Sequence, residues 1–203
     1  MRRQMLWLSL LINGCCTSTL SLAQDFDGAC LLVTQNMQWS GVAISPTEIL
    51  TVAHHGLSVG SEIQADFPEH KHGGSTRVSL KARVKKINKR ADICLLEYKA
   101  PEWACIKQYR VPVENPLTTR GRKVRIHGYV NHQPMFIEPE FERGDVYVTG
   151  AEDIAVNQFI AQAVEGMSGS PILIGDTLVG IQFGGGKKDL HAASVKTIQE
   201  FLK

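Results

Sequence analysis

Gly166-Met167-Ser168-Gly169-Ser170-Pro171 is the stretch of this 203-residue chain from which its fold and chemistry are inferred. A serine hydroxyl is a weak nucleophile at neutral pH until a neighbouring imidazole takes its proton. The glycine two positions before Ser168 lets the backbone turn sharply, so that the N–H groups of Gly166 and Ser168 can converge on a developing oxyanion. The stretch therefore predicts Ser168 as a nucleophile and the backbone of Gly166 and Ser168 as an oxyanion hole.

Two motifs upstream of the serine supply the partners that such a nucleophile needs. The motif Thr51-Val52-Ala53-His54 ends an apolar strand with a histidine, and Asp92 begins the apolar run Ile93-Cys94-Leu95-Leu96. A buried carboxylate needs hydrogen-bond donors, and an imidazole N–H is a suitable one. Taken alone, each is compatible with an ordinary role, an exposed histidine or a turn aspartate. Together with the serine they predict His54 as general base and Asp92 as the acid that orients it.

The first segment of the chain has the pattern of an export signal. Met1-Arg2-Arg3 is positively charged, residues 5–12 are apolar, and Ser21-Leu22-Ala23 ends the segment with small residues. We expect a signal peptide over residues 1–23, too short to anchor the chain in a bilayer, and a secreted or periplasmic protein. An alternative is the lipoprotein-like box Ile12-Asn13-Gly14-Cys15, which would tether the protein to a membrane through Cys15.

Charge and cysteine content give no support to a nucleic-acid partner or a zinc site. Removing Arg2 and Arg3 lowers the basic count from 22 to 20, which equals the 20 acidic residues, so nothing favours a nucleic-acid partner. Three cysteines remain, Cys30, Cys94 and Cys105, which permit one disulfide and a free thiol or no disulfide, and the sequence does not choose the pair. No spacing resembles a zinc site, so no metal or cofactor is expected.

The rest of the chain alternates short apolar strands with polar turns, and it ends in a helix with Val195, Ile198 and Leu202 at helical spacing. With 43% apolar residues the chain can bury a substantial core, and this pattern predicts one all-β domain over residues 24–203. Its parts are a barrel at about 29–100, a linker at about 101–117, and a second barrel with the helix at about 118–203. The strands are expected at residues 29–34, 40–45, 49–53, 78–87, 123–129, 145–149, 158–161, 171–174, 178–183 and 191–195.

The strand at residues 78–87 is strongly basic. Its alternation of apolar and polar residues indicates one wet face, on which lysines would discourage pairing with another chain. A binding site for an anionic polymer is the alternative. We favour the solvated face. The basic residues are Lys81, Arg83, Lys85, Lys86, Lys89 and Arg90.

The three motifs, in the order His54, Asp92, Ser168, resemble those of the trypsin-like (chymotrypsin-fold) serine peptidases, and the resemblance covers residues 29–203. It implies two packed six-stranded antiparallel β-barrels with a C-terminal α-helix and a substrate cleft between the barrels. It also implies an acyl-enzyme intermediate, a polypeptide substrate and a monomer. His54 is preferred over His55 because the family histidine directly follows the small pair matched by Val52-Ala53.

The C-terminal third resembles more closely the bacterial glutamyl endopeptidases. The matching segments are Gly169-Ser170-Pro171, Val179-Gly180-Ile181-Gln182-Phe183-Gly184-Gly185 and the end at Phe201-Leu202-Lys203. The resemblance implies that Phe183 to Gly185 pair with an extended substrate by main-chain hydrogen bonds. It also implies a primary specificity pocket lined by Gln162, Ala163 and Gln182.

Three positions depart from these patterns. Met167 stands where the trypsin group has an aspartate, so activation through a new N-terminus is not expected. Gln182 replaces the histidine of the glutamyl endopeptidases, and no acid stands at Gln162, which argues against glutamate and against Lys or Arg before the scissile bond. We predict a small or polar uncharged residue there. The sequence thus predicts a secreted serine endopeptidase, and its alternative is a catalytically silent homologue that acts as a binding module.

Overall fold

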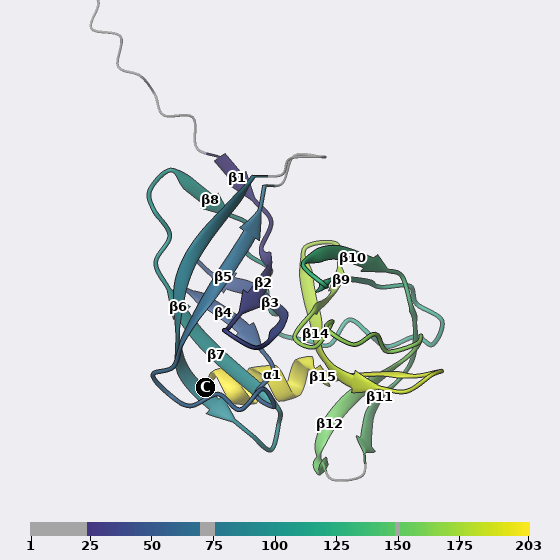
Figure 1. Cartoon of the computed structure of the whole chain (residues 1–203). Helices are drawn as coiled ribbons and strands as arrows, with labels where there is room; N and C mark the ends of the chain where they lie inside the picture. The colour runs from purple at the N-terminus through teal and green to yellow at the C-terminus, as the bar shows by residue number, and fades with distance from the viewer. Residues whose placement is uncertain (1–23, 70–75, 149–150) are drawn as a thin grey trace, which may run out of the picture.

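The computed structural model of the chain describes residues 24–69, 76–148 and 151–203. The predicted signal peptide over residues 1–23 lies outside the described residues. Figure 1 shows two β units side by side, with helix α1 (Val195–Leu202) between their lower ends. No helix in the described ranges is both long and apolar enough to span a bilayer. The predicted all-β fold with a C-terminal helix is confirmed.

The first unit is a closed barrel of six strands, in the order β2-β3-β4-β7-β6-β5. Along β6 the residues Val78, Leu80, Ala82 and Val84 are buried and those between them are exposed, which is the period of a strand with one wet face. The strand bounds are Ala29–Val33 for β2, Gln38–Ser45 for β3, Glu48–Thr51 for β4, Glu62–Pro68 for β5, Arg77–Asn88 for β6 and Ile93–Tyr98 for β7.

The wet face of β6 carries ion pairs with the neighbouring strands. Arg83 contacts Glu62 at 3.1 Å, and Lys85 contacts Glu48 at 2.7 Å. The hydrogen bond from Lys85 to Glu48 raises the pKa of this lysine. Two of the strand's positive charges are therefore partly neutralised on an exposed face, and the choice between a solvated face and a site for an anionic polymer stays a prediction.

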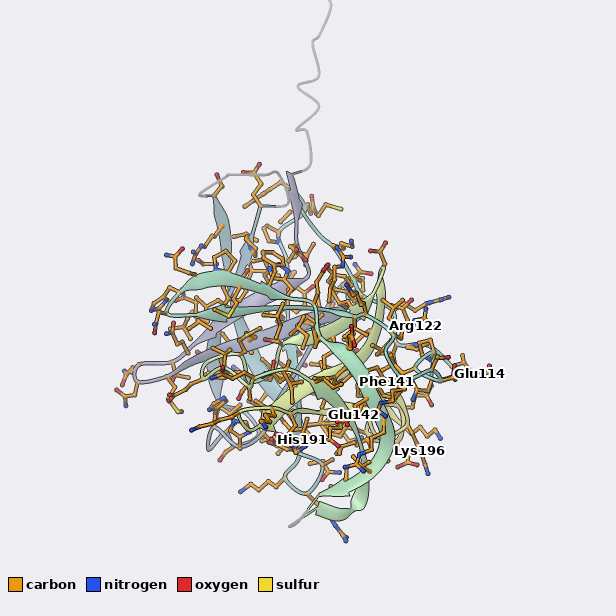
Figure 2. The ribbon with its side chains drawn as sticks, turned by 90° about the vertical axis from the view of Figure 1, so that its right-hand side faces the viewer. Glu114, Arg122, Phe141, Glu142, His191 and Lys196 are labelled. Atoms are coloured by element: carbon orange, nitrogen blue, oxygen red, sulfur yellow. The ribbon has the colours of Figure 1, made fainter. Side chains whose placement is uncertain are left out.

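The second unit is a curled seven-stranded sheet, rather than the closed set of six strands that the resemblance implied. The additional edge strand β10 contains Pro134, which a strand tolerates at the edge of a sheet because no partner needs its missing N–H there. In sheet order the strands are β10 (Gln133–Ile137), β9 (Arg125–Val130), β13 (Pro171–Ile174), β14 (Thr177–Gly185), β15 (Leu190–Ser194), β12 (Ala151–Ile160) and β11 (Glu140–Val148). Figure 2 turns this unit toward the viewer.

The three cysteines of the domain are free, so the alternative without a disulfide holds. Cys30 and Cys94 are buried, whereas Cys105 is exposed on β8 (Ala104–Ile106). Burial raises the pKa of Cys94 to about 12, which keeps this thiol protonated and unreactive. Strand β8, within the segment predicted as a linker, pairs in parallel with β1 (Gln24–Phe26).

Asp27 ties the start of the domain to the linker and to the second unit. Its carboxylate lies 3.2 Å from Nδ1 of His127 on β9 and accepts hydrogen bonds from the Tyr109 hydroxyl at 2.8 Å and the Ala29 N–H at 3.1 Å. Burial alone would raise the pKa of Asp27. The hydrogen bond and charge of His127, with the other two donors, outweigh it and lower the pKa to about 2.

Replacing Asp27 by asparagine should therefore destabilise the fold in a pH-dependent way. Because the folded pKa lies below the ordinary value of 3.8, the stabilisation is complete above that value and is lost as the pH falls toward 2. Chemical denaturation should show a loss of about 2 kcal/mol at pH 7 and about half of it at pH 3. The exposed control Glu97→Gln should change little, and an equal loss for Asp27→Asn at both pH values would contradict this account.

Candidate active site

The loop that carries Ser168 is held by hydrogen bonds to both β units. From the first unit, the Ser40 N–H donates to the Ser168 carbonyl at 2.8 Å. From the second, the Gly169 N–H donates to the Gln182 carbonyl at 2.8 Å and the Gln182 N–H donates to the Ser170 carbonyl at 3.0 Å. The main chain from the Ser168 carbonyl to Ser170 is therefore fixed between β3 and β14.

Gly169 is required at its position for two reasons. Its φ of 83° is in the left-handed region, and a Cβ atom there would lie 1.9 Å from the Ser40 carbonyl oxygen and 2.5 Å from Oγ1 of Thr51. Thr51 is itself fixed, because its hydroxyl donates to the Ser40 carbonyl at 2.7 Å and accepts from Nε1 of Trp39 at 2.9 Å. Since Thr51 precedes His54 by three residues, this close contact places the serine loop beside the histidine turn.

The structure joins His54 directly to Asp92. Nδ1 of His54 lies 2.6 Å from one carboxylate oxygen, and the other oxygen accepts the Ala53 N–H at 2.9 Å. One carboxylate thus fixes both the imidazole ring and the backbone just before it. The His54 side chain is 39% exposed and that of Asp92 is 21% exposed, so the pair is only partly shielded from water.

The turn that presents Asp92 is strained. Asp92 has a φ of 51°, which is uncommon for a residue other than glycine and is found mainly where the surrounding structure enforces it. The preceding turn is held by Asn88, whose side-chain oxygen accepts the N–H groups of Arg90 at 3.1 Å and Ala91 at 3.0 Å. These bonds hold the aspartate at the head of β7, toward the histidine.

His55 has a different environment from His54. Its ring packs against Trp39 with ring centroids 4.7 Å apart and against His54 at 4.3 Å. Burial, followed by the charge of His54, lowers the pKa of His55 to about 4, although Asp92 acts in the opposite direction. His55 is therefore neutral at neutral pH, and the histidine that bonds the carboxylate is His54.

The Ser168 hydroxyl is half-buried and makes no hydrogen bond to another described residue, His54 included. Such bonds are often long before a substrate is bound. Within the described part of the chain, the N–H groups of Gly166 and Ser168 also have no protein acceptor, and Gly166 has a φ of 92°. The structure thus joins His54 to Asp92 and docks the serine loop beside them, with two backbone donors unused.

The residues predicted to contact substrate lie on two neighbouring segments. The Ala163 N–H donates to the Gly186 carbonyl at 3.0 Å, which joins the segment before the serine to the chain just after β14. Gln162 is exposed, and Phe183 and Ala163 are half-buried. Gln182 is only 2% exposed. No group of three or more metal-binding side chains occurs in the described ranges.

The sequence did not indicate the residues that support the site. Ser40, Thr51 and Trp39 contact the serine loop or one another only because two distant strands meet, and no local pattern signals this. Asn88 had a weak signal, since an asparagine side chain in a turn often hydrogen-bonds the backbone two residues further along the chain.

Comparisons with known proteins relate this geometry to a family. A family model described as trypsin matches residues 26–201. The protease domain of MamO from Magnetospirillum magneticum is similar, with a TM-score of 0.68 and 18% identity over 91% of this chain and 98% of that chain. Rv3671c from M. tuberculosis H37Rv, in its inactive form, has a TM-score of 0.66 and 15% identity over 86% and 84%.

A third similar structure is the HtrA-type protease AlgW with a tripeptide, which has a TM-score of 0.69 and 15% identity over 90% of this chain and 61% of that chain. At such identities the structural likeness shows the fold alone. The search of curated proteins found no match.

Two glycines with positive φ offer a matched test of the docked loop. Gly169→Ala should lower the free energy of unfolding by about 3 kcal/mol, because the new Cβ meets the Ser40 carbonyl in addition to the backbone strain. Gly175→Ala should lower the free energy of unfolding by only about 1 kcal/mol. Gly175 also has a positive φ, of 59°, but a new Cβ there meets no atom within 4 Å. Urea denaturation measures both, and equal losses would show that the contact with Ser40 does not constrain the loop.

Proposed function

Because the chain belongs to the trypsin family and is a serine peptidase, we propose that it is an endopeptidase that acts through Ser168, His54 and Asp92. The observation that carries this proposal is the 2.6 Å contact between His54 and Asp92 beside a serine loop fixed by both β units. This arrangement supplies a nucleophile, a base and an orienting carboxylate on three segments that hydrogen bonds and close contacts hold together.

In the proposed reaction the Ser168 hydroxyl attacks the carbonyl carbon of the scissile bond while Nε2 of His54 takes its proton. Asp92 keeps the Nδ1 proton on the far side of the ring and stabilises the imidazolium that forms. The N–H groups of Gly166 and Ser168 bind the oxyanion. His54 then gives its proton to the departing amine. The acyl-enzyme is hydrolysed by a water molecule that His54 deprotonates in the same manner.

The substrate of this reaction would lie along the end of β14. The described pairing of β14 with β13 ends at Ile181, so on that edge β14 has no partner strand at Phe183 to Gly185. An extended polypeptide could therefore pair there by main-chain hydrogen bonds with Phe183 and Gly185, while Gln162, Ala163 and Gln182 face its side chain. This binding mode suits a polypeptide and requires no metal or cofactor.

The proposal includes export of the protein to the cell exterior or the periplasm. It rests on the charged and apolar pattern of residues 1–23, and the three unpaired cysteines neither require nor oppose it. The intact mass of the mature protein tests it. An N-terminus at Gln24 is expected, and a lipid-modified Cys15 would contradict the proposed cleavage after Ala23.

Reaction with a fluorophosphonate tests the activated serine. Such reagents modify a serine hydroxyl that a working base has made nucleophilic, so the intact mass should show one adduct mapped to Ser168. Ser168→Ala should show none. Ser170→Ala should react like the wild type, since the Ser170 side chain is fully buried. No adduct on the folded wild-type protein would overturn the proposed function.

Asp92→Asn should lower kcat by about 10⁴-fold while the protein stays folded, because an amide favours the wrong imidazole tautomer. The control Asp66→Asn changes a buried carboxylate on β5 that bonds only Gln64 in the described structure, and kcat should stay within about twofold. Turnover of a fluorogenic peptide measures both. An Asp92→Asn enzyme with nearly wild-type kcat would remove Asp92 from the mechanism.

A further inference from the structure

The proposed function determines which residues meet the substrate side chain that precedes the scissile bond. The substrate carbonyl must lie at the Ser168 hydroxyl with its oxygen at the Gly166 and Ser168 N–H groups. The bond from the Gly169 N–H to the Gln182 carbonyl places β14 directly beside the serine. The preceding side chain therefore enters the space between residues 162–165 and the end of β14.

The two walls of this space are in contact. The Ala163 N–H donates to the Gly186 carbonyl at 3.0 Å, and a Cβ atom at Gly185 would lie 3.0 Å from that of Ala163. The same Cβ would lie 2.4 Å from the Asp189 carbonyl oxygen, and Gly185 has a φ of 146°. Only glycine fits this approach, so the walls leave little width for a substrate side chain.

The turn behind Gly185 is fixed by Asp189. Its backbone carbonyl accepts the Gly186 N–H at 2.9 Å, and its carboxylate accepts the same N–H at 3.0 Å and contacts Nε2 of His191 at 3.1 Å. His191 is labelled in Figure 2 on the face of the second unit. Gln158 also donates to this carboxylate at 3.3 Å. Because these partners occupy it, Asp189 is poorly placed to bind a substrate Lys or Arg.

Val164 belongs to one wall of this space and Gln182 to the other. Val164 packs against the core of the second unit, which includes Leu190 and Ala192. Gln182 pairs with Ala192 across β14 and β15, so their side chains share one face of the sheet. The Gln182 side-chain oxygen is buried and has no hydrogen-bond partner among the described residues.

A buried acceptor without a donor is unfavourable, and a ligand that supplies the donor gains affinity by satisfying it. A hydroxyl on a short side chain can pass the narrow walls and donate to this oxygen. A charged substrate side chain gains little affinity, because the exposed residues near the space carry charges of both signs. Glu165 lies on one wall, and Lys187 and Lys188 lie on the other. We propose that the enzyme cleaves after serine, with Gln182 as the residue that recognises the hydroxyl and Ala163, Val164 and Gly185 as the residues that exclude larger side chains.

The test uses peptides that differ only at the residue before the scissile bond, which is Ser, Ala, Leu, Glu or Lys. Enzyme concentration is set by titration with the fluorophosphonate, so that a missing nucleophile is recognised separately from a wrong preference. The kcat/KM for Ser should exceed that for Ala by about 3- to 10-fold, the worth of one neutral hydrogen bond. It should exceed those for Leu, Glu and Lys by about 100-fold or more.

Titratable enzyme that prefers Leu, Glu or Lys would overturn the inference and leave the proposed function intact. Failure to titrate would overturn both.

Three variants test which residues determine the preference for serine before the scissile bond. Gln182→Leu should remove the preference for Ser over Ala, because the acceptor is lost. Val164→Ala should raise kcat/KM for Leu relative to Ser by about 10-fold, because the end of the space becomes wider. Val179→Ala removes the same two methyl groups from the same core, but on β14 rather than in the segment before the serine. It should leave the Leu/Ser ratio unchanged even if it lowers the melting temperature. A Ser/Ala preference that survives Gln182→Leu, or equal shifts in the two valine variants, would contradict the assignment.

Discussion

The contact between Gly169 and the pair Ser40 and Thr51 is the constraint on which the site depends. It joins a loop of the second unit to two strands of the first, at a distance that no side chain larger than hydrogen permits. The hydrogen bond from the Ser40 N–H to the Ser168 carbonyl also fixes the orientation of the serine backbone. A serine on one unit can cooperate with a histidine on the other only if the units cannot slide. Close packing and hydrogen bonds at this contact prevent the two units from sliding past one another. Packing of the apolar cores alone would not fix the position of the serine hydroxyl.

The histidine and the aspartate are braced within the first unit in a similar manner. Asp92 holds a left-handed backbone conformation, an unfavourable arrangement that is offset by its two bonds to Ala53 and His54 and by the Asn88 turn before it. Because one carboxylate binds both the ring and the adjacent backbone, the imidazole has little freedom to rotate. The partly exposed ring keeps its other nitrogen available. The same carboxylate therefore serves the local fold and the proposed chemistry.

Strands β2, β3, β4 and β6 of the first unit were predictable from the sequence, because β-forming residues, period-two alternation and turn residues mark them. Strands β5 and β7 of the same barrel were not among the expected strands. The edge strand β10 was missed for identifiable reasons: Pro134 lowers its strand propensity, and the turn before it uses Asn131 and His132 at positive φ, without a glycine to signal a tight hairpin. His54 and Asp92 were predicted as partners, and the structure places them in contact. The contacts of Ser40 and Thr51, and that of Ala163 with Gly186, join residues distant in sequence, so no local pattern could reveal them. The predicted glutamyl endopeptidase branch stays a prediction, since the comparisons show the family and not the branch.

The central claim is that Ser168 and His54 form one catalytic unit across the two β units. It is tested most directly by measuring kcat for Ser168→Ala, His54→Ala and the double variant on one peptide. If the two residues act together, each single change should reduce kcat by about as much as the double change, because either one disables the same step. Reductions that multiply in the double variant would show that the two residues act independently, and would contradict the account.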